Sequence, residues 1–226
     1  MKINLILEKI NPIRMLFKNP KTLIFDCGQL KSAIKGTPVD CDGNKIPWYT
    51  YPAIEFLGQL DFSDKSVFEY GSGNSSFFWA KRAKELISVD DDEKWHKLVS
   101  KEILLNQKIV LLKNREEYSN FIKSTNKKFD IIIIDAKYRM DCAKSAKDSL
   151  NSGGMIILDN SDWYPDVAKY IREQNFIQVD FAGFGPINSY TWVTSIFFSR
   201  EYNFKPINKQ PQYCIGGIKQ YAKNQD

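Results

Sequence analysis

Residues 67–76 read VFEYGSGNSS, and this stretch decides the fold of the 226-residue chain. A short apolar strand runs into a loop with glycine at alternate positions, Gly71 and Gly73, and Ser75 then opens a helix. Because glycine has no Cβ, backbone N–H groups in such a loop can face a bound molecule. The stretch therefore predicts a cradle for a nucleotide-like ligand at the carboxyl end of a strand.

Two acids narrow the class of ligand. Glu69 stands two residues before Gly71, and Ser76 holds the place where a dinucleotide fingerprint has its third glycine. An anionic pyrophosphate is disfavoured beside Glu69, whereas an ammonium or sulfonium group is favoured. Asp90 follows the next apolar run at the distance where a carboxylate accepts both hydroxyls of a ribose.

These residues resemble the class I S-adenosylmethionine-dependent methyltransferases, whose first motif is a Glu/Asp-x-Gly-x-Gly loop and whose second is an acid that ends the next strand. The resemblance implies S-adenosylmethionine as cofactor. The residues that it implies for the cofactor site are Glu69, Gly71, Ser72, Gly73, Asn74, Ser75 and Asp90. Asn114 follows the third strand and is expected to bond the adenine amino group, with a turn-forming asparagine as the alternative.

Apolar runs alternate with amphipathic stretches from residue 66 onward, which predicts an α/β fold. We expect a doubly wound, mostly parallel seven-stranded sheet with helices on both faces. The predicted strands are 66–70, 86–90, 108–112, 129–135, 155–159, 177–182 and 192–199, and the predicted helices are 75–84, 93–106, 116–124, 140–151 and 165–174. No helix separates the last two runs, so they should form a terminal antiparallel hairpin, as in the family named above.

Composition and charge indicate one domain with extensions. We assign residues 1–60 to an N-terminal extension with a cap helix at 53–60, residues 61–202 to the methyltransferase-like domain, and residues 203–226 to an irregular tail. The net charge of +5 comes from scattered lysines, so no nucleic-acid partner is expected. The four cysteines form no CxxC pair, which argues against zinc and disulfides and favours the cytoplasm.

The first 25 residues mix apolar and basic side chains, with prolines at positions 12 and 20. They match neither a signal peptide nor a transmembrane span. Packing against the domain is the preferred role for this segment, and peripheral contact with a membrane surface is the alternative.

Polar residues also end the fourth and fifth predicted strands, at Asp135 and at Asp159-Asn160. These three would supply oxygen ligands for Mg²⁺ or another divalent cation. With Lys137, they resemble the metal-dependent catechol and caffeoyl-CoA O-methyltransferases, which implies that a metal activates the acceptor hydroxyl while Lys137 acts as base or electrostatic partner. Lys137 is two residues after Asp135, whereas that group usually has its lysine three residues on.

A metal-free alternative makes Asp135 the general base or the anchor of the nucleophile. Tyr138 and Arg139 would then bind an acidic or glycan-type acceptor. Two further segments are candidates for contact with the acceptor: the aromatic stretch of Trp48, Tyr49 and Tyr51, and the loop at 185–190.

The sequence thus predicts a methyltransferase that acts on the oxygen of a small hydroxylated or glycan-type acceptor. One alternative is a metal-dependent glycosyltransferase that uses Asp90-Asp91-Asp92 as an Asp-x-Asp motif. A nicotinamide-dependent dehydrogenase is disfavoured by Glu69 and by the missing third glycine. A non-catalytic nucleotide-binding domain on the same fold is the remaining alternative.

Overall fold

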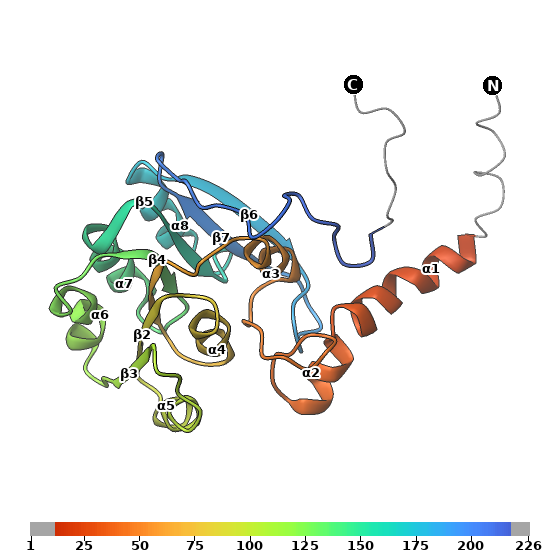
Figure 1. Ribbon diagram of the computed structural model, residues 1–226, viewed down its shortest axis with the longest axis horizontal. Helices are drawn as coiled ribbons and strands as arrows, with labels where there is room; N and C mark the ends of the chain where they lie inside the picture. Colours follow the sequence, from red (N-terminus) through yellow and green to blue (C-terminus); the bar gives the residue numbers. More distant parts are fainter. Residues whose placement is uncertain (1–11, 218–226) are drawn as a thin grey trace.

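The computed structural model describes residues 12–217, and its centre is a seven-stranded sheet in the order β3-β2-β1-β4-β5-β7-β6 (Figure 1). Its strands are β1 Ser66–Tyr70, β2 Glu85–Asp90, β3 Gln107–Leu111, β4 Phe129–Ile134, β5 Leu150–Asp159, β6 Ile177–Gly183 and β7 Trp192–Phe198. The first five strands are parallel to one another, while β7 runs antiparallel to both β5 and β6. The predicted fold class and its terminal hairpin are confirmed.

The described helices are α1 Pro12–Lys21, η2 Thr22–Asp26, α2 Gln29–Lys35, α3 Tyr51–Gly58, α4 Asn74–Ala80, α5 Glu93–Ser100, α6 Arg115–Ser124, α7 Arg139–Ala146, η3 Lys147–Ser149 and α8 Pro165–Glu173. Three predicted helices were too long. The side chain of Asn106 bonds the carbonyl oxygens of Ala80 and Ala83, which satisfies the end of α4 and holds the chain after α5 in a turn. The prediction that α7 reaches Asn151 was wrong because β5 already begins at Leu150 and pairs with Phe129.

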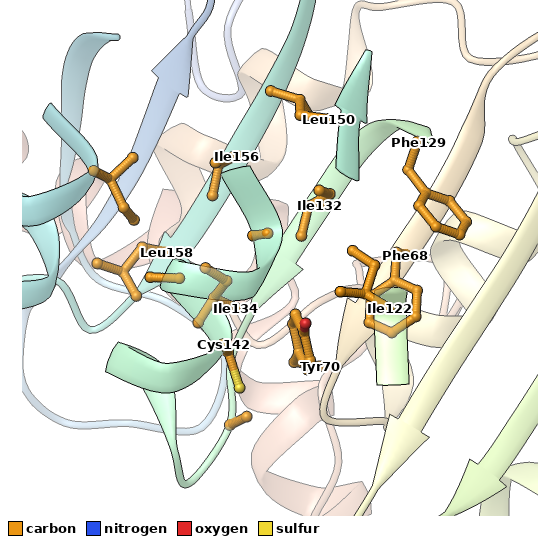
Figure 2. Close-up of a cluster of buried hydrophobic side chains, with 14 of the residues drawn as sticks. Phe68, Tyr70, Ile122, Phe129, Ile132, Ile134, Cys142, Leu150, Ile156 and Leu158 are labelled. Carbon is orange, nitrogen blue, oxygen red and sulfur yellow. The ribbon is translucent and has the colours of Figure 1, made fainter. Parts of the chain in front are cut away.

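Helices cover both faces of the sheet. Side chains of α6, α7 and α8 pack on one face, around Phe68, Ile132 and Leu158, and Figure 2 shows this cluster with Tyr70 and Cys142 at its lower end. Side chains of α3 and α4 pack on the other face, around Ile131 and Ile133. The last four residues of β4, 131–134, are all isoleucine and all buried, as expected for a strand that is covered on both faces.

The N-terminal helices lie outside this layered body, and Figure 1 shows α1 pointing away from it. Leu16 and Phe17 on α1 are exposed, and Lys18 and Lys21 lie in its last turn. Within residues 12–217, no helix is both long and apolar enough to cross a bilayer. Membrane contact through this segment stays a prediction, as do the domain boundaries, and residues 1–11 lie outside the described part of the chain.

Candidate active site

A cavity of about 290 Å³ lies at the carboxyl ends of β1 and β2, and we call it the cofactor cavity. Its lining comprises Pro38, Trp48, Glu69, Gly71, Ser72, Gly73, Asn74, Ser75, Asp90, Asp91, Asp92, Trp95, Tyr118, Asp135, Ala136 and Lys137. Seven of the eight residues expected at the cofactor are among them. Asn114 is not: its side chain accepts the N–H groups of Glu116 and Glu117 as the N-cap of α6.

Only one of the two loop glycines is required by backbone geometry. Gly71 has a φ of 90°, and a Cβ on it would collide with the main-chain carbonyl of Asp135. Gly73 is extended, and a Cβ there would lie 3.9 Å from the ring of Trp95, an ordinary contact. The glycine loop is therefore pressed against the end of β4 at Gly71 and faces Trp95 at Gly73.

Contrary to the prediction, the N–H groups of Gly71, Ser72 and Gly73 do not face the cavity. The N–H of Gly71 donates to the carbonyl of Val89, that of Ser72 to the Asp90 carboxylate, and that of Gly73 to the Ser76 hydroxyl. These bonds fix the loop before any ligand arrives. The cradle is therefore formed by the side chains that line the cavity.

Three serine hydroxyls donate to the buried carboxyl group of Glu69. Ser75 lies 2.5 Å from one oxygen, and Ser76 and Ser88 lie 2.6 and 2.7 Å from the other. Burial raises the pKa of Glu69 to about 7, although the three hydroxyls oppose the shift. The sequence pointed to Glu69 but not to this set of donors, because they come from both α4 and β2.

The raised pKa of Glu69 predicts that the free protein loses stability as pH rises. Between the ordinary value of 4.5 and the folded value of about 7, the folded protein holds a proton that the unfolded chain releases. The free energy of unfolding should therefore fall across this range by up to about 3 kcal/mol. Urea unfolding at about pH 5 and about pH 8 measures the loss, and Glu69→Gln should reduce it.

A matched control is Glu102→Gln, which removes an exposed carboxylate that pairs with Lys45. It should leave the pH dependence of the wild type in place. An equal loss of stability in the wild type and Glu69→Gln would show that Glu69 does not titrate in this range.

Asp90 ties the loop to the end of β2. One of its oxygens accepts the N–H and the hydroxyl of Ser72, and the other accepts the N–H of Asp92 at 2.7 Å. Burial raises the pKa of Asp90, and these bonds oppose the shift. A carboxylate offers about four acceptor positions, so Asp90 can still accept from a ligand.

A second cavity, of about 230 Å³, adjoins the first, and we call it the acceptor cavity. Its lining comprises Trp48, Asp135, Asp159, Asn160, Trp163, Asn188, Tyr190 and Trp192. Trp48 and Asp135 line both cavities. Of the expected lid residues, Trp48 reaches the cavities whereas Tyr49 and Tyr51 are buried, and the loop between β6 and β7 contributes Asn188 and Tyr190.

The three expected metal ligands lie together, but a guanidinium group stands between two of them. Arg139 donates to Asp135 at 2.8 Å and to the side-chain oxygen of Asn160 at 2.9 Å. It also donates to the carbonyl of Ala136, and its guanidinium lies 4.3 Å from the ring centre of Tyr164. As arranged, these residues do not fit a divalent cation, because Arg139 already supplies the positive charge.

Asp159 is engaged on its other side. Its Oδ1 accepts the indole N–H of Trp192 at 3.1 Å and the hydroxyl of Thr194 at 2.5 Å. Burial, and then the nearby Asp135, raise the pKa of Asp159 well above its usual range. Burial also raises the pKa of Asp135, and Arg139 opposes that shift. Among residues 12–217, no cluster of three or more His, Cys, Asp or Glu side chains is arranged to hold a metal.

Lys137 lies on the cofactor side of Asp135. Its ammonium group is 3.6 Å from a carboxylate oxygen of Asp91, and it lines the cofactor cavity but not the acceptor cavity. A role for Lys137 as base stays a prediction. Arg139 was expected to bind the acceptor with Tyr138, but neither residue is among those that line the two cavities, and Arg139 donates to Asp135 and Asn160 instead.

No protein-family model and no curated protein matches the chain. Among solved structures, it is similar to a precorrin-6y C5,15-methyltransferase from Geobacter metallireducens, with a TM-score of 0.50 and 11% identity over 65% of this chain and 86% of that one. The chain has the class I methyltransferase fold.

Other similar structures are an rRNA methylase from Streptococcus thermophilus and a spermidine synthase from Thermotoga maritima. The methylase has a TM-score of 0.49 and 16% identity over 66% of this chain and 97% of that one. The synthase has a TM-score of 0.49 and 19% identity over 68% of this chain and 57% of that one. No conclusion is drawn from these two similarities, and the reaction must be argued from the chain's own site.

Proposed function

We propose that the protein is an S-adenosylmethionine-dependent methyltransferase that acts on the oxygen of a small hydroxylated or glycan-type acceptor. One observation carries the proposal: Asp135 lines both the cofactor cavity and the acceptor cavity. A donor on one side and a hydroxyl on the other would meet at its carboxyl group. Such placement supplies much of the rate of a group transfer between two bound molecules.

The cofactor cavity has the groups that S-adenosylmethionine needs. Asp90 keeps about one acceptor position for a ribose hydroxyl, and the acid Glu69 suits a cationic amino-acid end. Trp95, which is partly exposed, adds flat apolar surface for the adenine base. When bound, the cofactor would supply an electrophilic methyl group on positively charged sulfur.

The residues of the acceptor side would prepare the oxygen. Asp135 accepts the proton of the acceptor hydroxyl, which leaves the oxygen able to attack. Arg139 holds the Asp135 carboxyl group in place through the bond at 2.8 Å, and Asn160 in turn fixes Arg139 by accepting from it at 2.9 Å. Burial raises the pKa of Asp135, which makes it a stronger base than an exposed aspartate.

Arg139 takes the position that the metal hypothesis gives to a cation. Under this proposal, turnover continues in EDTA, since the positive charge beside Asp135 belongs to the chain. Loss of turnover in EDTA, and its return with Mg²⁺, would favour the metal-dependent alternative.

The glycosyltransferase alternative needs free acids after β2. Asp92 is the N-cap of α5 and accepts the N–H groups of Lys94 and Trp95, and Asp91 pairs with Lys137. Neither arrangement favours a metal-bound sugar diphosphate.

Calorimetric titration of the full chain with S-adenosylmethionine, S-adenosylhomocysteine, NADH and a UDP-sugar tests the proposal. We expect binding of the two adenosyl compounds and no heat from the other two. Binding of the UDP-sugar alone would overturn the proposal. Transfer of labelled methyl groups into pools of metabolites and glycans then identifies the acceptor.

A further inference from the structure

Two aromatic side chains of the acceptor cavity stand side by side and remain partly in solvent. The rings of Trp163 and Tyr190 have their centres 6.1 Å apart and are tilted by 37°. Trp163 is 55% exposed and Tyr190 is 47% exposed. Tyr190 packs in turn against the buried Trp192, with ring centres 6.0 Å apart. The two rings therefore form an apolar surface that is supported by the buried Trp192 and is open to a ligand.

The rest of the lining is rich in hydrogen-bonding groups. Asp135, Asp159, Asn160 and Asn188 contribute carboxyl and amide groups to the same cavity. Arg139 uses the side-chain oxygen of Asn160, and the amide nitrogen of that residue donates to no other described residue. Carboxyl and amide groups together can pair with both the donor and the acceptor of a hydroxyl.

The charges of the cavity disfavour ionic ligands of either sign. An anion would face two acidic side chains, and the neighbouring guanidinium of Arg139 is already bonded to Asp135, Asn160 and Ala136. A cation would find Asp135 paired with Arg139 at 2.8 Å and Asp159 bonded by Trp192 and Thr194. An uncharged ligand meets neither obstacle.

We propose that the acceptor cavity binds an uncharged pyranose sugar, with a C–H face of the ring on Trp163 and Tyr190 and its hydroxyls on the acids and amides. A pyranose combines an apolar face with a rim of hydroxyls, which matches the two kinds of lining in this cavity. A flat phenol would use the rings but offers few hydroxyls to the four polar side chains. This inference rests on the proposed function and narrows its acceptor to one class.

Saturation-transfer NMR on the protein with bound S-adenosylhomocysteine tests the inference. The probes are the methyl glycosides of glucose, mannose, galactose and rhamnose, with glucuronate, glucosamine and catechol as comparators. We expect a neutral pyranoside to bind with its ring protons against aromatic side chains. Tyr190→Ala and Trp163→Ala should each weaken that binding roughly tenfold, while Tyr190→Phe retains it.

Phe184→Ala is the matched control for the loop. Phe184 lies in the same β6–β7 connection and is 41% exposed, but it does not line the acceptor cavity. This variant should bind the pyranoside as the wild type does, and a proton spectrum of each variant checks that it is folded.

Several results would overturn the inference. They are binding of no neutral pyranoside, preference for a charged sugar or for catechol, and unchanged binding in both Tyr190→Ala and Trp163→Ala. Calorimetry with S-adenosylhomocysteine on the same samples separates this failure from that of the proposed function. If the adenosyl compound does not bind, the function fails, and the pyranosides measured on the free protein then judge the sugar site alone.

Discussion

Replacing Asp135 with asparagine is expected to slow methyl transfer roughly 10²- to 10⁴-fold, the usual contribution of a general base. Asparagine has the same shape and can still accept from Arg139 through its carbonyl oxygen. It cannot take the proton of the acceptor hydroxyl. Initial rates with labelled S-adenosylmethionine, at saturating cofactor and acceptor, measure the loss.

Asp141→Asn is the matched control for this variant. Asp141 lies in α7 close to Asp135 in the sequence, but it pairs with the exposed Arg115 and lines neither the cofactor cavity nor the acceptor cavity. It should leave the rate unchanged. Affinity for S-adenosylhomocysteine should be nearly the same in Asp135→Asn and wild type, and a wild-type rate in Asp135→Asn would exclude this aspartate as the base.

Replacing Asp90 with alanine is expected to weaken binding of S-adenosylhomocysteine by roughly 100-fold or more. Each hydrogen bond between a ribose hydroxyl and a carboxylate contributes about 1.5–3 kcal/mol. The variant also releases Ser72, whose N–H and hydroxyl both donate to Asp90. Calorimetric titration of the two proteins measures the change in affinity.

Two further variants separate the direct effect from the effect on the loop. Ser72→Ala keeps Asp90 and removes one of its bonds to the loop, so it should weaken binding far less than Asp90→Ala. Glu93→Ala removes an exposed acid just beyond the cofactor cavity and controls for the lost charge. Unchanged affinity in Asp90→Ala would mean that another group holds the ribose.

The sequence predicted the sheet well because its signal is local. The first strand was predicted with both bounds correct, at Ser66–Tyr70. The apolar run of β4 by itself predicts a buried strand. The ends of helices were predicted less well. Lys81, Arg82 and Ala83 continue a helical pattern after α4, but the chain must turn there to enter β2 at Glu85. Tertiary constraint outweighs helix propensity at such positions.

The parts of the site that depend on strand ends were also predictable. Asp135, Asp159 and Asn160 meet at one edge because the parallel strands β4 and β5 end there. The role of Arg139 was not predictable in this way. It begins α7, and only the direction in which that helix leaves the sheet brings its guanidinium between Asp135 and Asn160.

The acceptor cavity shows the same limit. Tyr190 lies in a loop that the sequence marked as a candidate, whereas Trp163 precedes α8 and gave no signal of its own. Their pairing joins two connections that are distant along the chain. No periodic sequence pattern predicts that Trp163 and Tyr190 come into contact, because their contact is set by the insertion of β7 beside β5.

The backbone of the glycine loop lies directly against the backbone at the end of β4, because Gly71 packs on the carbonyl of Asp135. The distance between the glycine loop and Asp135, the proposed general base, is therefore set by the main chain and not by side-chain rotamers. Asn188 and Tyr190, by contrast, belong to a connection that does not take part in this contact. Under the proposed function, exchange of residues 186–191 would accordingly change which acceptor is bound while the cofactor side stays as it is.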